Sequence, residues 1–476
     1  MRRATVILVS LILVSSAGAA TIHGSKKADR LQSAFNGTDR INCGAGVDLA
    51  AADLGDRVSG CELVLRRLSV DLYKNSDSQH ESAVEPDSFS FGSTVVSAFQ
   101  VGRRENGAAA NIGTAVSTDA GRTWRRAYLP GTTVNASPPG PEVGASDPSV
   151  AYDAVHGYWL VSTLAIERNS SHIYIARSTD GRSWSAPVDA AVGPILDKEW
   201  VACDNGATSP YRGRCYLAYS DDDKNITVSQ FSTDGGATWS PPIRAAAILV
   251  GTQPVIRPDG TLVVVAGDYR GEDALAGSMI ALRSTDGAAT FTRIVVSDLQ
   301  AASNDPMRAI SLPSADVDSN GTIYAVWHDC RFRASCARND MVLSTSADGT
   351  TWTSPVRIPL AAIGSGTAFF IPGLAADPTR PGHLSLVYAY FHEGSKTLGV
   401  GVAQTRDGKT WNVRRLDPQA MPTTWLPRAE GGRMVGDYFS VSYTADRIVP
   451  VFALARAPVN GRLRQGIFAA SLPTLR

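Results

Sequence analysis

The stretch STDGGATW at residues 232–239 recurs, with small changes, at five other places in the chain. The other copies are STDAGRTW at 117–124, STDGRSW at 178–184, STDGAATF at 284–291, SADGTTW at 346–352 and TRDGKTW at 405–411. Successive aspartates of the pattern are separated by 61, 54, 52, 62 and 59 residues. A repeat of this length predicts one four-stranded sheet per copy, with the sheets arranged around an axis.

The residue types of the repeat suit a hairpin turn. An aspartate can accept hydrogen bonds from backbone N–H groups two or three residues further on, and glycine allows a positive φ. The aromatic residue at the end fills the gap between neighbouring sheets. We therefore expect the repeated aspartates to be structural rather than catalytic; they are Asp119, Asp180, Asp234, Asp286, Asp348 and Asp407.

These stretches resemble the Asp-box, or BNR, repeat of sialidase-like β-propellers, whose aspartate lies in the turn between the third and fourth strands of a blade. The resemblance covers roughly residues 60 to 475. The chain is also similar to exported bacterial proteins known only as sialidase-like, in the segments DKEWVACD (197–204), WHDCRFRASCARND (327–340) and GGRMVGDYFSVSY (431–443). It departs from sialidases in one motif, because residues 21–116 contain no Phe/Tyr-Arg-Ile-Pro sequence.

The resemblance and the alternating strands around each box predict an all-β propeller of seven blades, with six as the alternative. After the last box, the strands DYFSVSY (437–443), RIVPVFALA (447–455) and QGIFAASL (465–472) form a blade that lacks its fourth strand. Residues 62–73 (ELVLRRLSVDLY) are a strand candidate near the other end of the chain. Pairing this segment into the last blade would close the ring and remove exposed strand edges.

Residues 1–20 have a basic start, an apolar stretch and small residues at the end, which is the pattern of a cleavable secretory signal peptide. No later stretch is long and apolar enough to span a membrane. Lys+Arg and Asp+Glu number 45 each and no basic run occurs, which argues against nucleic acid as a partner. We expect a secreted monomer without a membrane anchor, organised as a signal peptide (1–20), an N-terminal lead (21–60) and the propeller (61–476).

All six cysteines lie in the part predicted to be exported, in three close pairs. Export favours local disulfides over metal binding or redox chemistry. We predict the disulfides Cys43–Cys61, Cys203–Cys215 and Cys330–Cys336. A zinc site is the alternative, but no pair has CxxC spacing and no histidine cluster accompanies the cysteines.

In a propeller of this kind, the loops before each first strand and after each second strand surround the central funnel on the face opposite the boxes. Polar residues before first strands include Glu85, Asp87, Asp147, Asp197, Lys198, Glu199, Gln253, Arg308, Asp437 and Tyr438. Those after second strands include Arg103, Arg104, Glu167, Asp268, Arg270, His328, Asp329, Arg331 and His392. Such a funnel suits an anionic sugar, because arginine binds carboxylates in a fork and carboxyl groups serve as acid and base.

We select from these a candidate catalytic centre. Arg331, Arg308 and Arg270 are the predicted substrate-binding cations, and Glu199, Asp329, Asp437 and Tyr438 are the predicted acid, base or nucleophile. The loose resemblance to sialidases favours Tyr438 as nucleophile, with Glu199 taking its proton. Structural interpretations stand beside these roles: Asp329 and Arg331 bracing their loop, Asp437 and Tyr438 forming a turn and a packed aromatic, and residues 197–199 forming a solvated charge cluster.

The sequence therefore predicts a sialidase-like exo-glycosidase that acts on an acidic terminal sugar of glycans. The alternatives are a polysaccharide lyase acting on uronates through His392, Tyr438 and Arg331, and a non-catalytic propeller that binds glycan or protein. No cofactor is expected. The acidic run at residues 221–223 with Asn225 could bind a structural calcium ion, but an acidic surface turn is the favoured interpretation because the EF-hand spacing and its distal glutamate are absent.

Overall fold

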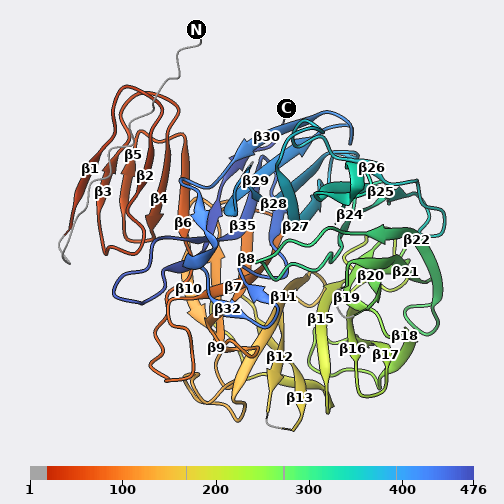
Figure 1. The fold of residues 1–476 in the computed structure, drawn as a ribbon. Helices are drawn as coiled ribbons and strands as arrows, with labels where there is room; N and C mark the ends of the chain where they lie inside the picture. The colour runs from red at the N-terminus through yellow and green to blue at the C-terminus, as the bar shows by residue number, and fades with distance from the viewer. Residues whose placement is uncertain (1–18, 168, 272–273, 393, 476) are drawn as a thin grey trace.

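The computed structural model describes residues 19–167, 169–271, 274–392 and 394–475 (Figure 1). Most of the predicted signal peptide, residues 1–18, lies outside this range. The described residues contain no α-helix, only two short 3₁₀ turns at Ala334–Cys336 and Thr423–Trp425. Within these ranges, none of the helical segments has the length and apolar character needed to cross a membrane.

Seven groups of four antiparallel strands surround a central axis (Figure 1). The first three groups are β7 (Ala83–Phe91), β8 (Thr94–Arg103), β9 (Ala109–Ser117) and β10 (Arg125–Tyr128); β11 (Gly144–Asp153), β12 (Tyr158–Ile166), β13 (Ser171–Ser178) and β14 (Val188–Gly193); and β15 (Leu196–Cys203), β16 (Cys215–Asp221), β17 (Ile226–Ser232) and β18 (Ile243–Ala247). The next three are β19 (Val250–Ile256), β20 (Leu262–Arg270), β21 (Ala276–Ser284) and β22 (Thr292–Gln300); β23 (Ser314–Val317), β24 (Ile323–Asp329), β25 (Asp340–Ser346) and β26 (Val356–Arg357); and β27 (Ala368–Ala376), β28 (Leu384–Phe391), β29 (Thr397–Thr405) and β30 (Trp411–Arg415). The last group combines β34 (Ser440–Tyr443), β35 (Arg447–Ala455) and β36 (Gln465–Ala470) with β6 (Leu63–Arg67). We call these groups blades one to seven.

The first strand of each blade is the inner one. Each inner strand contacts the next around the axis, and β34 of the last blade contacts β7 of the first. The prediction of an all-β propeller is confirmed. The count of seven blades, with which these groups and contacts agree, stays a prediction.

The last blade combines the two ends of the chain. β6 pairs antiparallel with β36, so that Arg67 lies opposite Phe468 and Leu65 lies opposite Ala470. The strand candidate near the N-terminus therefore occupies the fourth place that the C-terminal strands leave open. Leu65, Phe452 and Phe468 are fully buried in the largest apolar cluster of the molecule.

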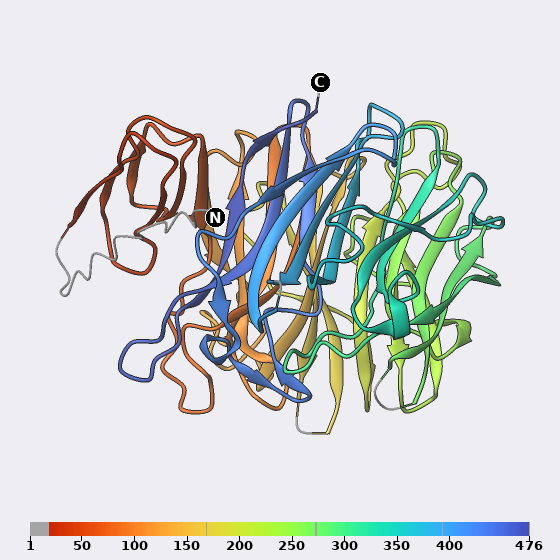
Figure 2. The same cartoon turned by 45° about the horizontal axis from the view of Figure 1, so that its top comes forward.

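The segment predicted as an N-terminal lead forms three stacked rungs beside the propeller (Figure 2). β1 (Thr21–His23), β3 (Arg40–Asn42) and β5 (Arg57–Ser59) make one parallel sheet, and β2 (Arg30–Gln32), β4 (Leu49–Asp53) and β6 make the other. Carboxylates join successive rungs: Asp39 accepts a hydrogen bond from the N–H of Ala20, and Asp56 accepts one from the N–H of Asp39. Because β6 belongs to this module and to blade seven, the two share a continuous sheet, and the division at residue 60 stays a prediction.

The box aspartates organise their turns, as Asp180 illustrates. Its Oδ1 accepts hydrogen bonds from the N–H groups of Ser183 and Arg182 at 2.7 and 2.8 Å and from the hydroxyl of Ser178 at 2.9 Å. The bond from Ser183 is the largest of the effects that lower the pKa of Asp180 to about 2. These contacts support a structural role for the boxes.

Hydrogen bonds from side chain to backbone join neighbouring inner strands. In each, a side chain accepts from a backbone N–H of the following blade: Asp87 from Val150 (2.8 Å), Ser149 from Val201 (2.9 Å), Gln253 from Ala315 (2.8 Å), Ser314 from Leu374 (2.9 Å) and Ser440 from Ser88 (3.0 Å). A buried N–H without an acceptor costs about 1–3 kcal/mol. We call these five contacts the inter-blade hydrogen bonds.

The inter-blade hydrogen bonds predict the effect of Ser314→Ala. The substitution leaves the N–H of Leu374 without its acceptor, so the free energy of unfolding should fall by about 1–3 kcal/mol. Urea denaturation followed by tryptophan fluorescence measures it. Ser76→Ala, at an exposed position, is the control and should change nothing. Equal stabilities of the two variants would contradict the role given to Ser314.

Candidate functional site

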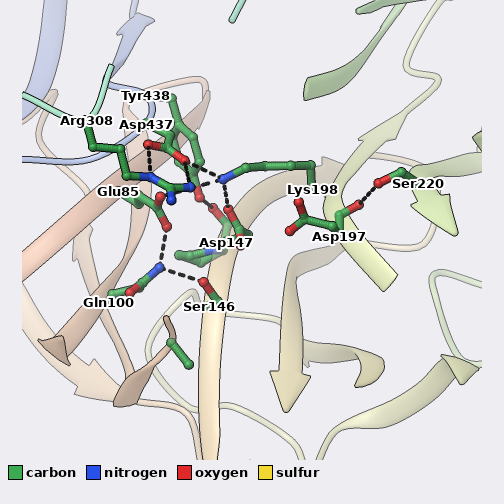
Figure 3. Close-up of polar contacts among 12 residues, drawn as sticks. Glu85, Gln100, Ser146, Asp147, Asp197, Lys198, Ser220, Arg308, Asp437 and Tyr438 are labelled. Atoms are coloured by element: carbon green, nitrogen blue, oxygen red, sulfur yellow. Dashed lines mark hydrogen bonds and ion pairs between the residues drawn. The ribbon is translucent and has the colours of Figure 1, made fainter. Parts of the chain in front are cut away.

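Left-handed residues interrupt the inner strands of blades one, two and three. Glu85, Asp147 and Lys198 have φ angles of 52°, 46° and 52°, and the strand register shifts at each of them. Such a β-bulge inserts one residue and re-aims the side chains around it. A non-glycine residue in this conformation costs about 1–3 kcal/mol, so the surroundings must hold it there. The three side chains converge near the axis (Figure 3).

The ammonium group of Lys198 lies at the centre of this convergence (Figure 3). Its Nζ is 2.7 Å from an oxygen of Asp147, 2.8 Å from one of Asp437 and 3.7 Å from one of Glu85. Lys198 is only 7% exposed. One buried cation therefore links the first three blades to the segment that enters blade seven.

Arg308 approaches Asp437 from the other side. Its Nε and Nη2 donate to the two carboxylate oxygens of Asp437 at 3.1 and 2.9 Å, which is a bidentate pair. The side chain of Arg308 keeps 29% of its surface exposed, whereas that of Asp437 is fully buried. Arg308 is thus the cation of the cluster that faces solvent.

The segment that carries Arg308 is fastened to a small hairpin, β32 (Arg428–Ala429) and β33 (Gly432–Arg433). The N–H of Arg308 donates to the carbonyl of Arg433, and the N–H of Arg433 donates to the carbonyl of Pro306, both at 2.8 Å. The other end of the hairpin is held to the segment that precedes blade one, where Gln79 exchanges two hydrogen bonds with the backbone of Arg428. The hairpin therefore links loops of different blades at the Arg308 end of the cluster.

A cavity of about 30 Å³ lies at the axis beside Lys198. Its lining includes Asp87, Asp147, Lys198, Glu199, Trp200, Gln253, Ser314, Asp437, Tyr438 and Ser440. This volume is enough for a water molecule or two and too small for a sugar ring. Glu199 is 1% exposed, and neither of its carboxylate oxygens has a hydrogen-bond partner in the described part of the chain.

The carboxyl groups around the cavity have opposite protonation tendencies. Burial, together with the charge of Asp147, raises the pKa of Glu199 well above its usual value. Burial acts on Asp437 in the same direction, but Lys198 and Arg308 outweigh it and hold the pKa of Asp437 well below the usual value. The pKa values of two carboxyl groups at one cavity are therefore shifted in opposite directions, which favours the protonated form of Glu199 and the ionised form of Asp437.

Two further carboxyl groups titrate near neutrality. Burial and the neighbouring Asp147 raise the pKa of Glu85 to about 7, and burial raises the pKa of Asp87 to about 7. Gln100 donates to Glu85 and, at 2.9 Å, to the hydroxyl of Ser146 (Figure 3). Glu85 thus keeps a hydrogen-bond donor in either protonation state.

Tyr438 lines the cavity, in the position where the sequence placed a nucleophile. Its hydroxyl donates to the carbonyl of Pro148 at 3.1 Å, and its ring packs against Trp200 with centroids 4.9 Å apart. Burial raises the pKa of Tyr438 well above its usual value. The hydroxyl has no hydrogen bond to Glu199, so the predicted tyrosine–glutamate pair is not assembled in this structure.

Arg331 and Asp329 lie apart from this cavity. The guanidinium of Arg331 donates to both oxygens of Asp329 at 2.9 and 2.7 Å, and its remaining contacts are with Ser297 and Asp298 of β22. β22 is the outermost strand of its blade, so the pair braces the blade periphery, as the structural interpretation proposed. Arg270 ends β20 with an exposed side chain and does not line the cavity.

The alternative lyase set is not brought together. His392 lies 4.0 Å from Asp417 in blade six, while Arg331 braces blades four and five and Tyr438 lines the axial cavity. Burial, followed by the charge of Arg415, lowers the pKa of His392. The three residues therefore occupy different parts of the propeller.

The three predicted disulfides are present. They join Cys43 to Cys61, Cys203 to Cys215 and Cys330 to Cys336. In the acidic run, Asp221 is bound by Lys224 at 2.7 Å. Across the ranges that the structure describes, no three acidic, histidine or cysteine side chains are grouped to hold a metal ion.

Sequence reasoning named Lys198, Glu85 and Asp147 as polar residues at first strands but did not select them for the site. The available signal was their shared position in the first strand of a blade, at the point where the strand register shifts in the structure. Their convergence at the axis depends on β-bulges, which cannot be predicted from the local sequence propensities. Trp200 was missed for a different reason, because an aromatic residue in a strand is normally assigned to packing.

Comparison with known proteins identifies the family. The family described as "BNR repeat-like domain" matches residues 172–445, which is more than half of the chain. The protein therefore belongs to the BNR repeat-like family. No curated protein matches the chain.

Several solved structures are similar to this chain. A polysaccharide lyase of family PL25, an ulvan lyase, has a TM-score of 0.50 at 11% identity, over 84% of this chain and 96% of that chain. A Hadza microbial sialidase has a TM-score of 0.46 at 18% identity, over 74% and 69% of the two chains. The α-L-arabinanase of Penicillium chrysogenum has a TM-score of 0.43 at 19% identity, over 72% and 96%. At these identities the likeness concerns the fold alone.

The raised pKa of Glu85 predicts a pH dependence of stability. Its pKa rises from 4.5 to about 7 on folding, so between these values the native protein binds more protons at this group than the unfolded chain does. The free energy of unfolding should consequently fall as the pH rises through that window. Glu85→Gln should flatten the fall, measured by urea denaturation across the window.

The matched control is Glu105→Gln, at an exposed carboxylate. It should retain the pH dependence of the parent protein. If Glu85→Gln and the parent show the same slope, the assignment of a raised pKa to Glu85 is wrong.

Proposed function

We propose that the protein is a secreted glycoside hydrolase of the exo-sialidase type, which releases an acidic terminal sugar from glycans at the axial cavity. The proposal is supported by two unlike carboxyl groups that line one cavity. Glu199 is buried with neither oxygen hydrogen-bonded to a described residue, and its pKa is raised, whereas Lys198 and Arg308 contact Asp437 and lower its pKa. Most glycoside hydrolases use such a combination of an acid and a carboxylate, although sialidases with a tyrosine nucleophile are an exception. The signal-like N-terminus and the three disulfides support secretion.

Each group has a defined part in the proposed reaction. The carboxyl proton of Glu199 passes to the glycosidic oxygen as the bond to the anomeric carbon breaks. The ionised Asp437 faces the positive charge that develops on the sugar ring. Water then adds to the anomeric carbon and returns its proton to Glu199, so the enzyme ends as it began.

Arg308 is the proposed contact for the acidic group of the sugar. It is the partly exposed cation of the cluster, and its Nη1 has only a 3.5 Å contact with the carbonyl of Glu430. A carboxylate on the substrate can replace that contact with a charge-assisted hydrogen bond. Lys198, in contrast, is buried and fully engaged, so we assign it to positioning Asp147 and Asp437.

The cavity must widen for this reaction. A sugar ring needs far more room than about 30 Å³. The β32–β33 hairpin is the segment we expect to move, because hydrogen bonds fasten it to the backbone on both sides of Met307 and to Gln79. Its apolar anchorage includes Ala429, which packs with Val84 and Met434 in a small cluster. Outward movement of the hairpin would also free Arg308 from Glu430.

The proposal predicts the activity of three variants. Glu199→Gln and Asp437→Asn should each lower the release of sugar from sialyllactose or uronate oligosaccharides by about 100- to 10,000-fold, because each removes one of the two carboxyl functions. Tyr438→Phe should keep most of the activity, since its hydroxyl only donates to Pro148. Glu167→Gln, at an exposed carboxylate, is the control.

Sugar release and the absorbance of an unsaturated product are followed together, with circular dichroism to confirm folding. Loss of activity in Tyr438→Phe alone would replace the carboxylate mechanism with a tyrosine nucleophile. A rise in absorbance without hydrolysis would instead identify a lyase. The absence of both signals, with measurable glycan binding, would identify a binding propeller.

A further inference from the structure

One position of the inner strands breaks the pattern of the inter-blade hydrogen bonds. The residues at this position are Asp87, Ser149, Trp200, Gln253, Ser314, Gly373 and Ser440, and all but Trp200 and Gly373 accept an N–H of the next blade. Gly373 has a steric cause, since a Cβ there would lie 2.3 Å from the carbonyl oxygen of Phe439. Trp200 needs another explanation.

Pro254 supplies that explanation. In the other blades the N–H that must be satisfied belongs to the residue directly after the accepting position, such as Val150 after Ser149 or Ala315 after Ser314. In blade four the corresponding residue, after Gln253, is Pro254, which has no N–H. Blade three therefore needs no hydrogen-bond acceptor at position 200. The side chain there does not have to accept an N–H of the next blade, as the equivalent side chains of five other blades do.

The released position carries a large aromatic residue that faces the cavity. Trp200 is partly exposed and lines the cavity next to Glu199. Its ring meets that of Tyr438 at 68° with centroids 4.9 Å apart, so Tyr438 fixes its orientation from one side. Neither carboxyl oxygen of neighbouring Glu199 has a hydrogen-bond partner among the residues that the structure describes.

We propose that Trp200 is a specificity-determining residue that stacks on the ring of a pyranose sugar bound at the axis. The negative face of an aromatic ring attracts the C–H groups on the apolar face of a sugar. The indole N–H donates to an oxygen of the same sugar, while Glu199 reaches its glycosidic oxygen. This inference rests on the proposed function, because it places the sugar in the same cavity, and it adds the surface that recognises the ring.

Binding and turnover are measured with Trp200→Phe and Trp200→Leu. The probes are sialyllactose and a glucuronate oligosaccharide, with neutral lactose as the reference ligand. Trp200→Phe keeps an aromatic face and should hold the dissociation constant, measured calorimetrically in the Glu199→Gln background, within about threefold of the parent. Trp200→Leu should raise it by about three- to tenfold. Phe89→Leu, at an exposed aromatic residue on β7, is the control and should leave binding unchanged.

Thermal melting confirms that each variant folds. If Trp200→Leu does not fold, the double variant Trp200→Ser with Pro254→Ala takes its place, because the new serine can accept the new N–H as Ser149 does from Val201. It should also weaken sugar binding.

The outcomes separate this inference from the proposed function. Hydrolysis by the parent protein with unchanged affinity in Trp200→Leu overturns the role of Trp200 and leaves the hydrolase intact. Binding without hydrolysis that is weakened in Trp200→Leu supports Trp200 and overturns the hydrolase. Failure of the parent protein to bind either acidic probe overturns both.

Discussion

The inner strands must approach closely around the axis, and each N–H group buried there then needs an acceptor. The side chains of neighbouring strands supply acceptors at five blade boundaries. In blades one and two the accepting residue lies two positions after a left-handed residue, and Trp200 has the same place in blade three without accepting an N–H. The bulges that accommodate the left-handed residues turn Glu85, Asp147 and Lys198 towards the axis. The same local distortion therefore accompanies both the closure between blades and the assembly of the site.

The chemistry of the site depends on which carboxyl group the two cations, Lys198 and Arg308, contact. Lys198 and Arg308 both contact Asp437, whereas Glu199 has no partner among the described residues. A buried carboxylate without a cation is too costly to keep ionised, so it retains its proton. The acid and the ionised carboxylate of the proposed reaction are thus two results of one charge balance. In the proposed reaction, access to them requires outward movement of the β32–β33 hairpin.

The fold could be predicted because each box carries its own turn chemistry within a few residues, and because strand edges need partners. The same argument placed β6 in the last blade. Site prediction was less successful, because convergence at the axis depends on bulges and on contacts across the whole ring. Arg331, selected for its charge and loop position, is instead held by Asp329 and β22. Residues 21–60 gave no strand expectation, since their rungs are short and their acceptors lie 17 to 19 residues away.

Infrared difference spectroscopy tests the protonation of Glu199 most directly. In mildly alkaline buffer, above the pKa of about 7 of Glu85 and Asp87, the band of a protonated carboxyl group should persist. The account predicts that Glu199→Gln removes this band, while Glu85→Gln leaves it in place. A protein without the band under these conditions, or a band that survives Glu199→Gln, would contradict the claim that the axial cavity holds a protonated acid.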